Sequence, residues 1–275
     1  MPPTHAPAPR TLAWLIVGVA ALLTAAAIIA LAAPQSAGTA PATCLDPGAT
    51  LSPRCFCEAI RQDLLRQPAN ALSSLAFVVA GGAAYRRRRA LPPGTRERAL
   101  APALAATLVA LGAGSLAYHG ALTFAGQLLD VQGMYLLGLL LVVGALWRAG
   151  TLTARQATAA LVVALGVLIA AQVGFPDARR WLFAVVLVPG ILLERRLAPS
   201  SRPLRLAVLA LGVAYAVWVA DDRGWWCQST SWLQGHALWH LLTAVSGGLV
   251  VEHYLVTARA RAMTDVSAET ATPPK

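Results

Sequence analysis

Three histidines, a serine and an aspartate stand at spacings that suit metal chemistry. His236 and His240 are four residues apart, so a helix places both imidazoles on one face, about 6 Å apart along its axis. That geometry lets one helix offer two ligands to a metal ion. The alternative interpretation is a pair of histidines at a membrane interface, beside Trp232 and Trp239.

The third histidine, His119, belongs to a second stretch of this kind. Ser115 precedes it by four residues, and Asp130 follows it by eleven. Catalytic zinc takes three protein ligands and keeps a fourth position for water, whose pKa it lowers while it polarises a carbonyl group. A carboxylate can act as the base that takes the proton. Three imidazoles and one carboxylate therefore predict a zinc hydrolase.

The chain is too apolar for a water-soluble protein. Hydrophobic residues make up 57% of its 275 residues and charged residues 12%, against roughly 25% charged residues in soluble domains. The mean hydropathy is +0.61. This composition excludes a disordered chain, a coiled coil, a disulfide-stapled mini-protein and a soluble globule. It predicts an all-α, polytopic membrane helical bundle.

Apolar stretches predict a seven-span core plus one extra N-terminal span. A span needs about 20 residues, and the candidates are approximately 12–33, 70–85, 99–119, 127–147, 157–175, 181–193, 204–220 and 235–257. The sixth is short, and arginines beside it can reach the interface. The predicted segments are a cytoplasmic tail (1–11), the extra span (12–33), an external segment (34–69), the core (70–257) and a cytoplasmic tail (258–275).

Positive charges between the spans predict the orientation. With the N-terminus inside, 16 of the 22 Lys and Arg residues lie on the cytoplasmic side and 6 lie outside, in agreement with the positive-inside rule. Both termini are then cytoplasmic, and the candidate ligands lie towards the outer face of a membrane, best matched by a bacterial inner membrane. The net charge of +10 thus reflects orientation, and we expect no nucleic-acid partner.

The first span has two interpretations. Its basic start and Ala-rich end are typical of a signal sequence. Its apolar stretch is longer than the roughly 7–15 residues of a signal core, which favours a retained helix.

Other polar residues near the spans have simpler interpretations. His253 stands beside Glu252 and about 20 Å along the helix from His240, so we expect an interfacial histidine. Asp221 and Asp222 follow the seventh span. Two carboxylates can bind a cation, but a solvated loop turn is the favoured interpretation.

All four cysteines fall in segments predicted to lie outside, where disulfides can form. They are Cys44, Cys55, Cys57 and Cys227. The spacing of Cys55 and Cys57 is too tight for a usual zinc pair, and the residues alone leave three disulfide pairings open.

These blocks resemble the alkaline ceramidase family of seven-span membrane zinc hydrolases, in a superfamily with the adiponectin/progestin receptors and Per1-like proteins. The resemblance covers residues 57–254, and the extra first span is not part of the family core. Its blocks are Cys57-Glu58 with PANALS at 68–73, the stretch from 114 through His119 to Asp130, and Cys227 with HALWH at 236–240.

The resemblance implies a role for each residue. Zinc would be bound by His119, His236 and His240. Ser115 and Asp130 would contact the metal-bound water or the substrate carbonyl. A disulfide would join Cys57 to Cys227, leaving Cys44 and Cys55 as a second, local pair.

The sequence also departs from that family. Cys55 and Phe56 occupy positions where an Asp and a Trp are expected, and Gln67 replaces a Glu. Animal members carry a calcium-binding segment here, and we predict no calcium site.

The resulting hypothesis is a zinc-dependent amidohydrolase of the membrane that cleaves ceramide or a similar N-acyl lipid. Two rivals come from other classes. One is a receptor or scaffold of the same superfamily with a structural zinc ion, and the other is a helix bundle that binds haem through paired histidines. The oligomeric state is not predicted.

Overall fold

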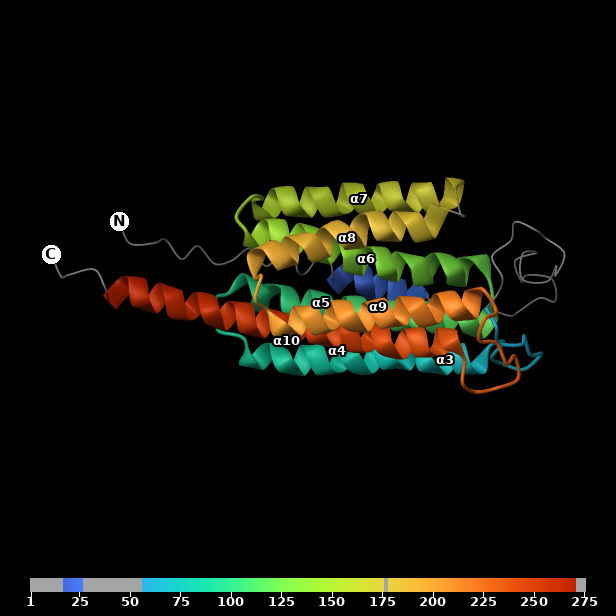
Figure 1. Ribbon diagram of the computed structural model, residues 1–275. Coiled ribbons are helices and arrows are strands. Elements are labelled where there is room, and N and C mark those ends of the chain that lie inside the picture. The colour runs from blue at the N-terminus through green and yellow to red at the C-terminus, as the bar shows by residue number, and fades with distance from the viewer. Residues whose placement is uncertain (1–16, 27–55, 176–177, 271–275) are drawn as a thin grey trace.

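The computed structural model describes residues 17–26, 56–175 and 178–270, and every regular element in this part of the chain is a helix. The helices lie side by side along a common direction (Figure 1). They are a short helix Val17–Ala26, α3 (Pro68–Ser73), α4 (Leu75–Arg87), η1 (Arg88–Ala90), α5 (Arg96–Ala121), α6 (Phe124–Arg148), α7 (Ala154–Gly174), α8 (Arg179–Leu197), α9 (Arg202–Asp222) and α10 (Gly235–Thr270). The all-α prediction is confirmed for these residues.

Hydroxyl side chains fix where several helices begin. Thr95, Thr123 and Ser201 each accept a hydrogen bond from a backbone N–H in the first turn of the helix that follows. Thr153 forms a capping box with Gln156 at the start of α7. Such caps satisfy N–H groups that the helix itself leaves without a partner.

Helices α5 and α6 form the centre of the bundle and approach closely because glycines face the neighbouring backbone. A Cβ at Gly126 would lie 2.8 Å from the Cα of Tyr118, and a Cβ at Gly133 would lie 2.7 Å from the Cα of Leu111. Small residues permit such close packing between membrane helices. The pair therefore forms a rigid support for groups at its ends.

Helices lie at all seven predicted core positions, and five helices in the described part are long and apolar enough to cross a membrane. Those five are α5, α6, α7, α9 and the Gly235–Met263 part of α10. α8 has arginines in its first and last turns, and α4 is short but continues almost directly from α3. α8 is longer than the predicted sixth span. Only Val17–Ala26 of the predicted first span is described.

A buried ionic cluster joins the helix ends remote from the three candidate histidines. Arg148 pairs with Glu194, and its guanidinium lies 3.6 Å from the carboxylate of Glu97. His253 Nε2 lies 3.0 Å from Glu194, and its Nδ1 lies 2.8 Å from the hydroxyl of Ser201. The cluster connects α5, α6, α8 and α10 with Ser201, the residue that caps the start of α9.

The prediction of an interfacial His253 is therefore wrong, since its side chain is 0% exposed. Its neighbour Glu252 does lie at the surface, where it pairs with Arg87 at 2.8 Å. Successive residues of a helix point in different directions, so Glu252 faces outwards while His253 faces α8.

Candidate metal centre

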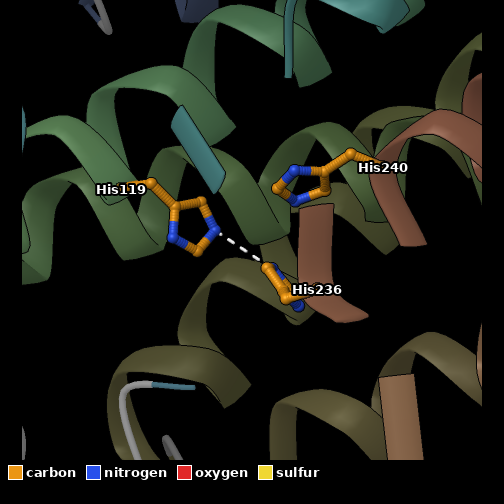
Figure 2. Close-up of side chains that lie close together, drawn as sticks. All are labelled: His119, His236 and His240. Carbon is orange, nitrogen blue, oxygen red and sulfur yellow. Dashed lines mark hydrogen bonds between the residues drawn. The ribbon is translucent and has the colours of Figure 1, made fainter. Parts of the chain in front are cut away.

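Three buried imidazoles converge at one end of the bundle (Figure 2). His119 comes from the last turn of α5, and His236 and His240 come from the first turns of α10. One ring nitrogen of each lies within 4.8 Å of those of the other two. The histidines could therefore hold one metal ion.

The donor set fits a metal such as zinc. The Nε2 atoms of His119 and His236 are 3.0 Å apart, and two imidazole nitrogens at this distance either share a proton or bind one cation. Neutral imidazoles are common zinc ligands, and three of them leave a fourth position open. The three rings are tilted or edge-on to one another and are not stacked face to face.

The first turn of α10 is held in place by the end of α9. The Asp221 carboxylate accepts hydrogen bonds from the backbone N–H groups of His236, at 3.2 Å, and Cys57, at 3.1 Å. Gly235 permits this approach, since a Cβ there would lie 2.8 Å from the Cβ of Asp221. Asp221 is 3% exposed, so the predicted solvated turn is wrong at this residue, while Asp222 does pair with Arg180 near the surface.

The short helix α3 supplies hydrogen-bond partners for His240. The Nδ1 atom of His240 lies 3.1 Å from the carbonyl oxygen of Asn70 and 2.9 Å from the hydroxyl of Ser73. A carbonyl oxygen only accepts, so Nδ1 donates to Asn70 and the Nε2 lone pair is available to a metal. The side-chain amide of Asn70 is buried and has no hydrogen-bond partner among the described residues.

Ser115 and Asp130 lie beside the histidines. The Ser115 hydroxyl is 3.2 Å from His240 Nε2 and accepts a hydrogen bond from the Ser74 hydroxyl at 3.0 Å, and the Asp130 carboxyl lies near Ser115. Gly114 allows this arrangement, because a Cβ there would lie 2.8 Å from the backbone of Leu129. Asp130 is half-buried as a residue, whereas the three imidazoles are buried.

A segment that we call the strap, residues 56–67, crosses this end of the bundle. A disulfide bond joins Cys57 to Cys227, and the Ala59 N–H donates to the Ser229 carbonyl at 2.9 Å. Phe56 stacks on His236, with ring centroids 3.6 Å apart. Its φ of 59° lies in the left-handed region, where a non-glycine residue costs about 1–2 kcal/mol. Cys44 and Cys55, the suggested second pair, lie outside the described residues.

Glu58 of the strap caps α3. Its carboxylate accepts hydrogen bonds from the N–H groups of Ala69, at 2.7 Å, and Asn70, at 2.8 Å. Burial raises the pKa of the Glu58 carboxyl above its usual range, against the lowering effect of these two donors. The strap thus positions α3, which in turn contacts His240.

Comparison with known families agrees with this architecture. The family model described as Ceramidase matches residues 56–270. The chain belongs to the ceramidase family. The match begins at the strap and includes the three histidines of the candidate metal centre, together with Ser115 and Asp130. No curated protein matches the chain.

Three residues that hold this candidate site in place are absent from the predicted set of site residues: Asp221, Gln67 and Glu58. Gln67 Oε1 lies 2.8 Å from His119 Nδ1. The sequence did single out this position, because Gln67 stands where the resembling family has a Glu. Asp221 had no comparable signal, because its partners are 15 and 164 residues away.

Proposed function

We propose that this ceramidase-family protein is a zinc-dependent amidohydrolase that cleaves ceramide or a similar N-acyl lipid. The observation that carries the proposal is the position of Ser115 and its neighbour Asp130 beside three converging imidazoles. A purely structural metal site needs neither group. His119, His236 and His240 would hold the metal.

A zinc ion held by three imidazoles supplies a Lewis acid and lowers the pKa of a bound water molecule. Asp130 accepts a proton from the attacking water and passes it to the amine nitrogen as the carbon–nitrogen bond breaks. Ser115 donates a hydrogen bond to the carbonyl oxygen as negative charge develops there. The products are a fatty acid and a free amine.

The membrane setting completes the proposal. The chain has a seven-span core at 70–257 and an extra span at 12–33, with external residues 34–69 and cytoplasmic tails at 1–11 and 258–275. The active site faces the outer side of a bacterial inner membrane. Exposed apolar side chains on α7 and α9, such as Val163 and Leu209, face the lipid, from which the substrate enters.

The test uses the full chain purified in detergent. We expect about one zinc ion per chain by mass spectrometry and release of fatty acid from fluorescent ceramide. An N-acyl amine without the sphingoid base, tested alongside, defines the substrate class. A colourless protein without a Soret band excludes the haem alternative.

Two variants separate metal binding from proton transfer. We expect Asp130→Asn to retain zinc and lower kcat about 10²–10⁴-fold, and His236→Ala to lose both zinc and activity. Asp63→Asn, at an exposed residue of the strap, is the matched control and should change neither. Full activity in either of the first two variants would overturn the assignment. Bound zinc without any amide hydrolysis would instead support the receptor or scaffold function.

A further inference from the structure

We propose that Gln67 is a positioning residue that fixes the tautomer and ring orientation of His119. The inference rests on the proposed function, since it takes His119 to be a zinc ligand. Gln67 is 0% exposed and stands at the end of the strap, immediately before α3.

Two contacts determine which way the Gln67 amide points. Its Nε2 lies 3.2 Å from the backbone carbonyl of Glu58, and its Oε1 lies 2.8 Å from His119 Nδ1. A carbonyl oxygen accepts hydrogen bonds and cannot donate them, so the NH₂ group must face Glu58. Oε1 then faces His119 and can only accept.

This orientation dictates the protonation of His119. Nδ1 must carry the hydrogen that Oε1 accepts, so Nε2 keeps its lone pair. Nε2 is also the atom 3.0 Å from His236 Nε2. The amide thereby directs the metal-binding nitrogen into the cluster. Hydrogen bonds of this kind orient histidine ligands and raise their basicity.

The backbone around Gln67 is held by the same helix end. Its N–H donates to the carbonyl of His119 at 3.0 Å, and the Arg66 N–H donates to Gly120 at 2.9 Å. Glu58 is fixed in turn by its hydrogen bonds to the first turn of α3. The amide is therefore rigidly placed.

The geometry also explains why an amide suits this position. A carboxylate would accept from His119 but could not donate to the Glu58 carbonyl, whereas an apolar side chain could do neither. Gln67→Glu therefore removes the anchor and keeps the acceptor, and Gln67→Met removes both. Gln172→Met is a matched control, because Gln172 is a buried glutamine of α7 whose amide partner is Gln132 at 2.6 Å.

The experiment measures zinc affinity and stability separately. Metal-free protein in detergent is titrated with Zn²⁺ against a chromophoric chelator, and thermal unfolding of the metal-free forms is recorded. We expect Gln67→Met to weaken zinc binding about 10–100-fold. Gln67→Glu should retain tight binding but unfold at lower temperature, and Gln172→Met should also lose stability without losing affinity.

A second measurement needs no variant at position 67. In metal-free protein labelled with ¹⁵N-histidine, imidazole shifts should show His119 as the Nδ1–H tautomer, with the resonance identified by its loss in His119→Gln. An Nε2–H tautomer, or wild-type zinc affinity in a folded Gln67→Met protein, would overturn the positioning role. If the folded wild-type protein binds no zinc, the proposed function fails and this role with it.

Discussion

The carboxylate of Asp221, at the end of α9, accepts a hydrogen bond from the backbone N–H of His236 at 3.2 Å. The same carboxylate accepts from the N–H of Cys57 at 3.1 Å. One buried side chain thus connects the disulfide-bonded strap to the first turns of α10, which carry two candidate ligands.

Removing this carboxylate should weaken both the fold and the metal site. Asp221→Ala leaves buried N–H groups without an acceptor, at a cost of about 1–3 kcal/mol in the free energy of unfolding. We expect a lower unfolding temperature and weaker zinc binding by chelator competition. Asp222→Ala removes the same charge from a surface pair with Arg180 and should cost at most about 1 kcal/mol. Equal effects of the two variants would contradict the capping role.

Gly114 should be required for the Ser115–Asp130 pair. A Cβ there would lie 2.8 Å from Leu129 and 2.9 Å from the backbone nitrogen of Asp130, so Gly114→Ala must push α6 away. We expect lower kcat with zinc retained. In the control Gly82→Ala, the new methyl group meets nothing within 4 Å, and activity should be unchanged. Normal kcat in Gly114→Ala would show that the close approach is dispensable.

The buried ionic cluster makes Arg148 important for stability. Arg148→Met leaves the carboxylates of Glu194 and Glu97 buried without this cation, which should cost about 3–5 kcal/mol. Arg87→Met breaks the exposed pair with Glu252 and should cost about 0–1 kcal/mol. Unfolding in mixed micelles measures both. Similar losses of stability in the two variants would mean that the ionic cluster around Arg148 is as hydrated as the surface pair of Arg87 and Glu252.

The raised pKa of Glu58 predicts a pH dependence of stability. The Glu58 carboxyl binds its proton more tightly in the folded protein than in the unfolded chain. The free energy of unfolding therefore rises as the pH falls through the pKa of Glu58 in the folded protein. Below the pKa of Glu58 in the unfolded chain, this residue contributes no further change. The wild type should therefore gain stability relative to Glu58→Gln over that range. A difference independent of pH would contradict the raised pKa.

Removal of the metal should destabilise the wild type alone. A ligand present at 1,000 times its Kd stabilises the folded state by about 4 kcal/mol. We expect a chelator to lower the unfolding temperature of the wild type and to leave that of His236→Ala unchanged. Re-addition of Zn²⁺ should restore the unfolding temperature of the wild type and should not change that of His236→Ala.

Local patterns were sufficient to predict the helices and to bring together the three histidines, but not to find the groups that hold them. The spacing of His236 and His240 lies within one helix, and their convergence with His119 followed from the alternating direction of the spans. Asp221, Gln67 and His253 depend on partners 164, 52 and 59 residues away. Helix packing decides which side chains meet across the bundle. The roles of these three residues therefore could not be predicted from their neighbours in the sequence.

The ligand spacing also determines when the centre can first exist during synthesis. His119 and His236 are separated by 117 residues, and Cys57 and Cys227 by 170. A nascent chain that ends before α10 contains one of the three imidazoles and therefore no chelating site. The three-imidazole centre can therefore be complete only after the first turns of α10 have been synthesised, late in biogenesis.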